Sequence, residues 1–202
     1  QCTDCEIGKY STATKAVGCT TASTCGAGRY IKIPSTSTTD TECEDCAVGR
    51  ASAGGLNTCG ECTGEGEYSD ETGLSACKTA SAGSKPNAMR TGVTDCPAGR
   101  FSVGGATSCA ECKSGETSDA GAAGCRPCLT CGLGEYQIAE CTADTETRCG
   151  NCVAGKASMG GAVSECTLCD GPGEYSEEKA SVCKIAPAGY KPKVTGDDGL
   201  KT

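Results

Sequence analysis

The chain has 202 residues, of which 21 are cysteine and only 3% are aromatic, with one phenylalanine and no tryptophan. So few bulky side chains cannot offset the backbone entropy of ordering this length, roughly 1–2 kcal/mol per residue, which excludes a single globular core. The formal net charge of −8 disfavours nucleic acid and anionic membranes as partners, and no apolar run approaches the roughly 20 residues that span a bilayer.

The cysteine content predicts the fold class. Cysteine makes up about a tenth of the chain, a level typical of disulfide scaffolds in secreted proteins. No segment has the apolar period of a helix, whereas short stretches with serine, threonine and valine alternate with glycine-rich turns. We therefore expect a small disulfide-rich protein, an elongated rod of tandem cysteine-rich modules with short β-strand pairs and little or no helix, outside the cell or on its surface.

The chain repeats itself with a period of about 106 residues, which divides it into a first copy, 1–108, and a second copy, 109–202. Most cysteines recur at this spacing. Two cysteines of the second copy, Cys128 and Cys141, do not, because residues 22 and 35 of the first copy are alanine and serine. Their joint absence is what we expect of the two halves of one disulfide.

In chain order, the cysteine loops close most simply on themselves, so that a CxxC motif ends one loop and opens the next. With Cys128–Cys141 interlocked with one of these loops, the predicted bridges are Cys5–Cys19, Cys25–Cys43, Cys46–Cys59, Cys62–Cys77, Cys96–Cys109, Cys112–Cys125, Cys128–Cys141, Cys131–Cys149, Cys152–Cys166 and Cys169–Cys183. Spacing alone leaves the connectivity open, although the internal repeat narrows it. Cys2 has no partner within this sequence, so we expect the natural chain to continue at both ends.

The aromatic residues share one sequence position. Each follows a glycine-containing step soon after a loop-opening cysteine, which predicts a miniature core of one ring packed on one disulfide. A binding role for the tyrosines is the alternative. The residues are Tyr10, Tyr30, Tyr68, Phe101, Tyr136, Tyr175 and Tyr190.

Several segments contain no motif that predicts a specific site. The tract 35–39, Ser-Thr-Ser-Thr-Thr, is expected to be a loop that could carry O-glycans or be bare and solvated. Residues 78–95 and 184–202 read as linkers. The acidic pairs Glu177-Glu178 and Asp197-Asp198 lack the ligand spacing of a calcium loop, so solvated faces are expected there.

Catalytic, metal and cofactor sites are not expected. Eight CxxC motifs suggest zinc as an alternative, but the chain has no histidine and its loops close evenly. A thioredoxin-like redox pair needs a helix start, and none is predicted. The absence of histidine also removes Ser-His-Asp and Cys-His catalysis.

Two parts of each copy resemble known extracellular modules. The run from Cys112 to Cys149 resembles a tumour-necrosis-factor-receptor cysteine-rich module, and 5–43 resembles the variant that lacks one bridge. This resemblance implies the pairing Cys112–Cys125, Cys128–Cys141 and Cys131–Cys149. The stretches 46–108 and 152–202, with Cys-Pro-Ala-Gly-Arg-Phe at 96–101, resemble the ephrin-receptor-like cysteine-rich repeat.

Two functional hypotheses follow from these observations. The long regular repeat favours a structural or adhesive protein of a stalk, surface coat or mastigoneme-like appendage filament, plausibly of a protist or alga. The family resemblance allows a ligand-binding receptor ectodomain instead, and an enzyme is least favoured. The expected partners are other protein chains, through self-association or contact with neighbouring surface proteins. Membrane contact is expected only through a segment outside this sequence.

Overall fold

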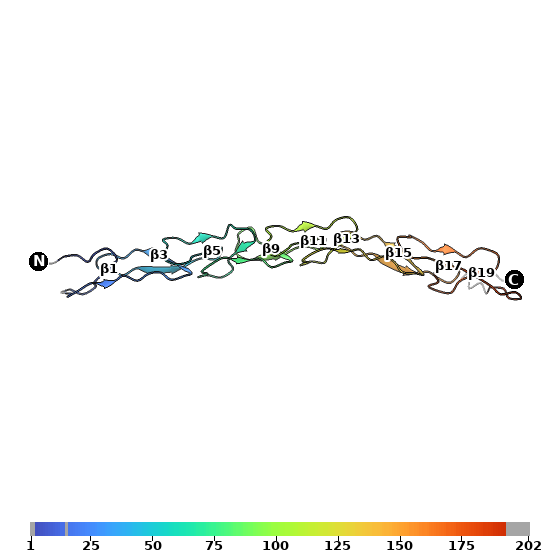
Figure 1. Cartoon of the computed structure of the whole chain (residues 1–202), viewed down its shortest axis with the longest axis horizontal. Coiled ribbons are helices and arrows are strands. Elements are labelled where there is room, and N and C mark those ends of the chain that lie inside the picture. Colours follow the sequence, from blue (N-terminus) through green and yellow to red (C-terminus); the bar gives the residue numbers. More distant parts are fainter. Residues whose placement is uncertain (1–2, 15, 193–202) are drawn as a thin grey trace, which may run out of the picture. The chain divides into compact units, whose positions relative to one another are not determined.

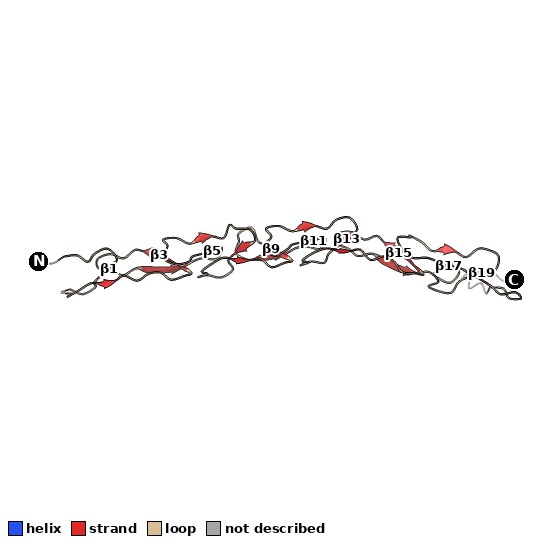
Figure 2. Cartoon of the chain, in the orientation of Figure 1, coloured by secondary structure: helices blue, strands red, loops and turns tan. Residues whose placement is uncertain are grey.

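A computed structural model describes residues 3–14 and 16–192. In these ranges the chain forms short strands of two to five residues and no helix (Figures 1 and 2). The strands are β1 Lys9–Tyr10, β2 Thr20–Thr21, β3 Arg29–Ile33, β4 Glu42–Asp45, β5 Arg50–Ala51, β6 Gly60–Glu61, β7 Glu67–Tyr68, β8 Lys78–Thr79, β9 Ser84–Pro86, β10 Val93–Asp95, β11 Arg100–Phe101, β12 Ala110–Glu111, β13 Glu116–Thr117, β14 Arg126–Pro127, β15 Glu135–Ala139, β16 Arg148–Asn151, β17 Lys156–Ala157, β18 Thr167–Leu168, β19 Glu174–Tyr175 and β20 Lys184–Ile185.

The predicted fold class, a small disulfide-rich protein with short strand pairs, is thereby confirmed. The described ranges contain no helical segment that could serve as a membrane span. The strand lengths agree with the composition, because short runs between glycine turns and cysteines leave no room for longer ladders.

The chain divides into two compact units, which are described separately. The first unit comprises residues 1–97, 101–110 and 120–124, and the second comprises 98–100, 111–119 and 125–202. The limits of these units do not test the copy boundary at residue 108, which stays a prediction.

Each unit is a series of antiparallel hairpins made from strands adjacent in sequence. The first unit holds the pairs β1–β2, β3–β4, β5–β6, β7–β8 and β9–β10, and the second holds β13–β14, β15–β16, β17–β18 and β19–β20.

The two longest hairpins, β3–β4 and β15–β16, occupy corresponding places in the two copies. Their register shifts between Ile31 and Ile33 in the first and between Gln137 and Ala139 in the second. A bulge at the same repeat position shows that the sequence period is also a structural period.

Disulfides close the loops of these hairpins, except that of β9–β10, which contains no cysteine. Their Cα–Cα distances, 5.6 to 6.0 Å, lie in the ordinary range for disulfides. The bridges are Cys5–Cys19, Cys25–Cys43, Cys46–Cys59, Cys62–Cys77, Cys96–Cys109, Cys112–Cys125, Cys128–Cys141, Cys131–Cys149, Cys152–Cys166 and Cys169–Cys183. Cys2 lies outside the described residues.

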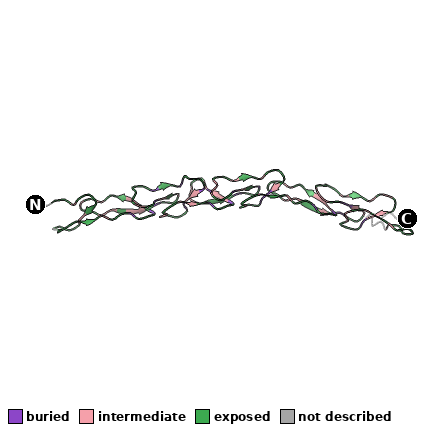
Figure 3. Ribbon diagram, viewed as in Figure 1, coloured by how far each residue is buried: buried purple, intermediate pink, exposed green. Residues whose placement is uncertain are grey.

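Cysteines and small residues supply what is buried, as Figure 3 shows by the short purple stretches of each unit. Cys46, Cys96 and Cys152 are fully buried. The other buried residues are cysteine, alanine, serine, threonine or glycine, together with Pro86. The apolar core is therefore replaced by many small contacts around the sulfur bridges.

Main-chain hydrogen bonds connect each hairpin to the next one. In the first unit the Gly49 N–H donates to the carbonyl of Ser69 (2.8 Å), and in the second the Gly155 N–H donates to the carbonyl of Ser176 (3.1 Å). The receiving serines are buried, and their hydroxyls bond to the main chain: Ser176 Oγ donates to the carbonyl of Lys156 (2.8 Å). The joint thus depends on backbone polar groups rather than on large side chains.

Glycine is required where two such backbones approach most closely. Gly28 has a φ of +82°, and a Cβ there would lie 2.0 Å from the carbonyl oxygen of Gly73. At the corresponding contact of the second copy, a Cβ on Gly134 would lie 2.1 Å from the carbonyl oxygen of Lys179. Lys179, with a φ of 61°, therefore occupies the left-handed position that Gly73 fills in the first copy.

Candidate interaction surface

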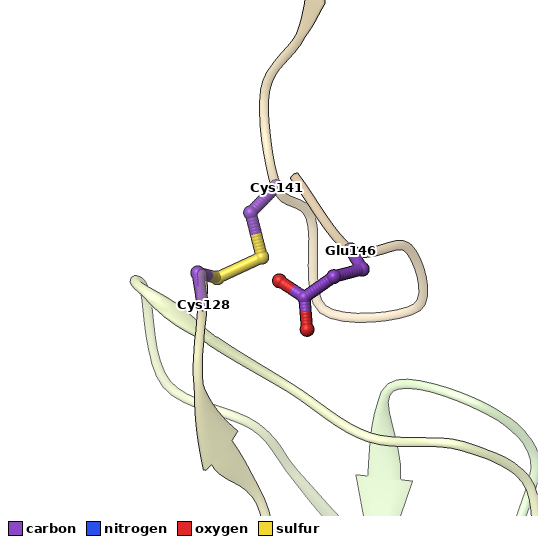
Figure 4. A group of neighbouring side chains, drawn as sticks. All are labelled: Cys128, Cys141 and Glu146. Atoms are coloured by element: carbon purple, nitrogen blue, oxygen red, sulfur yellow. A yellow bond between two sulfur atoms is a disulfide. The ribbon is translucent and has the colours of Figure 1, made fainter. Parts of the chain in front are cut away.

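The disulfide found only in the second copy lies beside a carboxylate (Figure 4). Ligand atoms of Cys128, Cys141 and Glu146 lie within 4.8 Å of one another, a grouping that could suggest a metal site. The two sulfurs are bonded to each other, however, so no thiolate is free to ligate a metal while the bridge is intact.

The Glu146 carboxylate instead holds the polypeptide backbone. It accepts hydrogen bonds from the main-chain N–H of Leu129 (2.8 Å) and of Thr147 (3.1 Å), and the Arg126 Nε lies 3.5 Å from its other oxygen. These donors, led by the Leu129 amide, lower the pKa of the Glu146 carboxyl. We call this arrangement the acid clasp of the second copy.

The first copy has the same clasp without the disulfide. Asp40, the counterpart of Glu146, accepts from the main-chain N–H of Ser23 (2.6 Å) and of Thr41 (2.7 Å). The Ser23 hydroxyl adds a third bond to the other carboxylate oxygen (2.6 Å) and is the main reason that the pKa of Asp40 is lowered. A side-chain hydrogen bond thus joins the two loops that Cys128–Cys141 joins covalently in the second copy.

The acid clasp was not predicted from the sequence. The sequence does contain a signal for it, because an acidic residue stands at the same repeat position in both copies, Asp40 and Glu146. Asp40 is present although the first copy lacks the two cysteines that correspond to Cys128 and Cys141.

A groove in the first copy is lined by charged residues that pair with one another. Its cavity measures about 660 Å³ and is lined by Tyr30, Glu44, Asp45, Ala47, Arg50, Thr58, Cys59 and Thr72. On its β3–β4 side, the Tyr30 hydroxyl donates to Glu44 (2.6 Å), and the Lys32 ammonium donates to the other Glu44 oxygen (3.0 Å). These two bonds lower the pKa of Glu44, and the acceptor in turn raises the pKa of Tyr30.

Two other charged residues of the first groove, Arg50 and Asp45, also form ion pairs. Arg50 and Glu61 face each other across β5–β6 with 2.6 Å between the guanidinium and the carboxylate. Arg29 and Asp45 face each other across β3–β4 at 2.9 Å. The charges of the first groove are therefore satisfied within the chain.

The corresponding groove of the second copy has fewer charged residues in its lining. It has about 260 Å³ and is lined by Tyr136, Asn151, Val153, Lys156, Glu165 and Cys166; an adjoining hollow shares the last three of these residues and adds Thr167 and Leu168. Gly150 takes the place of Glu44, and Ile138 the place of Lys32. The side chains of Ile138 and Tyr136 lie over Gly150, where a Cβ would be 2.8 Å from Ile138 Cδ1 and 3.1 Å from Tyr136 Cε1.

Apolar side chains around this second groove are open to solvent. Ile138 is 53% exposed, Val153 61% and Leu168 56%. Among the residues that the structure describes, neither Lys156 nor Glu165 takes part in an ion pair. We define the second groove by Tyr136, Ile138, Gly150, Val153, Lys156, Glu165 and Leu168.

The aromatic residues are placed unevenly. Six of the seven are partly buried in hairpins, whereas Tyr190 is 78% exposed. Tyr190 and Tyr175 line a hollow of about 540 Å³, together with Glu177 and Glu178. Packing of the rings on disulfides stays a prediction.

The tract 35–39 forms a loop closed by its own threonines. Thr36 Oγ1 accepts from the main-chain N–H of Thr38 (3.2 Å) and of Thr39 (3.0 Å). Its modification by O-glycans stays a prediction, and Asp197 and Asp198 lie outside the described residues.

Comparison with known proteins gives this chain no family. No protein-family model matches it, and no curated protein is detectably similar to it. The findings support an array of tandem cysteine-rich modules with disulfides typical of extracellular proteins.

Proposed function

We propose that this protein is an extracellular structural or adhesive protein that builds a stalk, a surface coat or a mastigoneme-like appendage filament. The observation that carries the proposal is the repetition of one construction within each unit: short hairpins, most of them closed by a disulfide, with main-chain hydrogen bonds between successive hairpins. Such an array gains modules without needing a larger core, because each module contacts mainly its neighbours.

The proposed location rests on the disulfides. Ten bridges in a chain with so little apolar core are stable in an oxidising compartment and would be lost in a reducing cytosol. Non-enzymatic action fits the absence of histidine from the sequence. The proposed partners are protein chains, namely other copies or neighbouring surface proteins.

A ligand-binding ectodomain is the second candidate. The interlocked bridges Cys128–Cys141 and Cys131–Cys149 favour it, since their order along the chain is that of a tumour-necrosis-factor-receptor-like module. The flanking hairpins would then be ephrin-receptor-like spacers that hold the binding module away from the membrane.

Immunoelectron microscopy of the native source, under non-reducing conditions, distinguishes the two candidates. Antibody label at regular intervals along a fibre or across a coat is the expected result. Label scattered over the plasma membrane, with no ordered assembly beneath it, would contradict the structural function and favour the receptor.

A further inference from the structure

The two copies differ most in the residues that face each other across their hairpins. In β3–β4, Tyr30 stands opposite Glu44, and in β15–β16 Tyr136 stands opposite Gly150. The first pair is a hydrogen bond of 2.6 Å reinforced by Lys32. The second pair has lost its acceptor, and the residue corresponding to Lys32 is isoleucine.

The next hairpin shows the same change. Arg50 stands opposite Glu61 in β5–β6 and forms an ion pair with it, whereas Lys156 stands opposite Leu168 in β17–β18. Glu44 and Arg50 line the first groove, and Lys32 and Glu61 are bonded to them. Between the two copies, therefore, three charged residues in this region have become glycine or aliphatic, and one lysine has lost its acidic partner.

The fold does not need these apolar residues. The first copy forms the same hairpins, with the same bulge, with Lys32 in place of Ile138, Ala47 in place of Val153 and Glu61 in place of Leu168. Single exposed apolar residues are common on protein surfaces, but here three lie close to one another. Val153 lines the second groove, Leu168 lines the adjoining hollow, and Ile138 lies over Gly150 beside the groove residue Tyr136. A cluster that folding does not require indicates contact with another molecule.

We propose that the second groove is a self-association surface, which binds the second groove of another copy of this chain about a two-fold axis. Its charges identify the occupant. Lys156 and Glu165 lie together beside the apolar centre, and neither has an ion-pair partner among the described residues. In a two-fold contact each lysine meets the glutamate of the other copy, so the surface is complementary to itself.

This contact rests on the proposed structural function and supplies one of its chain–chain contacts. Because a two-fold contact is closed, it pairs chains, and a different contact must extend the assembly. The two-fold contact joins chains through their second copies and leaves the ion-paired first groove outside the interface. An apolar centre with two reciprocal ion pairs has the composition of a protein–protein interface.

The first experiment measures association of the full, oxidised chain by sedimentation velocity over a concentration series reaching about 1 mM. The wild-type chain is expected to form dimers. The variant Ile138→Lys/Gly150→Glu/Leu168→Glu carries the first copy's residues, which the hairpin is known to accommodate, and should associate at least about tenfold more weakly. The control Ile185→Thr replaces another exposed aliphatic residue by its first-copy counterpart outside the groove and should dimerise like the wild type.

Charge exchange provides a second test that does not alter the apolar centre. Lys156→Glu and Glu165→Lys should each weaken the dimer, because each brings like charges together across the axis. Together they should restore it, because the reciprocal pairs are re-formed with their signs exchanged. A monomeric wild-type chain, an unimpaired triple variant, or a double exchange that fails to restore association would overturn the proposal.

The same variants separate this contact from the function on which it rests. Native fibres or coats that incorporate the triple variant normally would refute the surface and leave the structural function standing. Dimers that respond to the variants as expected, from a source without ordered assemblies, would refute the structural function and leave the surface standing.

Discussion

At the scale of single residues, two acidic residues 106 positions apart close corresponding loops of the two copies, one beside a disulfide and the other without one. Asp40 and Glu146 each accept hydrogen bonds from two main-chain amides of the loop that they close. In the second copy a disulfide closes the same loop covalently. In the first copy the Ser23 hydroxyl supplies the connection, so closure depends on the charge of Asp40.

The clasp of the first copy should therefore open in acid. The pKa of Asp40 in the folded chain lies below its ordinary value of 3.8, chiefly because Ser23 donates to the carboxylate. A lowered folded pKa contributes stability that is fully present above the ordinary value and is lost as the pH falls through the folded one. In an acid titration followed by NMR, the Ser23 and Thr41 amides should lose their hydrogen-bonded shifts.

The second copy provides the control for this titration. Protonation of Glu146 also weakens its clasp, but Cys128–Cys141 keeps the surrounding loop closed. The variant Asp40→Asn should reproduce the acid state of the first loop at neutral pH. Equal opening of both loops, or no change at Ser23, would contradict this role of Asp40.

A second residue-scale prediction concerns Lys179, which holds the left-handed conformation that Gly73 has in the first copy. A side chain in this region costs about 1–2 kcal/mol relative to glycine. Lys179→Gly should therefore be more stable than Lys179→Ala by about 1 kcal/mol in local opening measured by hydrogen exchange. The comparison with alanine removes the effect of losing the ion pair with Glu135. Equal stability of the two variants would argue against strain at this position.

At the scale of elements, each hairpin is too short to be stable by itself and is stabilised locally. Strands of two residues are too short to persist alone, and a disulfide with main-chain bonds to the next hairpin compensates. The longer β3–β4 and β15–β16 pairs share a bulge, so corresponding loops of the two copies should accept each other's cross-links.

The double substitution Ala22→Cys/Ser35→Cys tests this equivalence. The corresponding cysteines of the second copy are bridged with Cα atoms 6.0 Å apart. Oxidative folding should join the two new cysteines and stabilise the first loop by about 3 kcal/mol, the value for a loop of this size. Thiol counting and protease resistance of the loop provide the measurement. Free thiols at both positions, or mispairing with Cys25 or Cys43, would show that the loops are not equivalent.

The hairpins also show which features could be predicted from the sequence and which could not. Cysteine content and glycine spacing were sufficient for the fold class, because loop closure is a local property that spacing records. The grooves were not predicted, because they depend on cross-strand register. Lys32 and Glu44, or Ile138 and Gly150, are twelve residues apart in the chain, and a bulge between them changes which side chains meet.

At the scale of the whole molecule, stability resides in many separate closures. The buried residues are mainly cysteine, serine and glycine, so removing one bridge should loosen its neighbourhood without unfolding the chain. Reduction of all bridges removes the constraint on the unfolded state and leaves no core to replace it.

Stepwise reduction should follow this local organisation. Cys46, Cys59 and Cys62 are buried, whereas Cys5, Cys128 and Cys141 are partly accessible. Under limiting phosphine, the bridges Cys5–Cys19 and Cys128–Cys141 should open before Cys46–Cys59 and Cys62–Cys77, because access to the sulfur governs the rate. Alkylation and mass spectrometry of the intermediates give the order. Simultaneous loss of all bridges would indicate one cooperative structure instead.

The disulfide pairing is the feature on which the structure and the proposed function most directly depend. Peptide mapping of the native, non-reduced protein by mass spectrometry tests this pairing in one measurement. Ten bridges of the pattern described are expected, including Cys128–Cys141 interlocked with Cys131–Cys149. A bridge within any CxxC motif, or Cys128 joined to a cysteine other than Cys141, would contradict it.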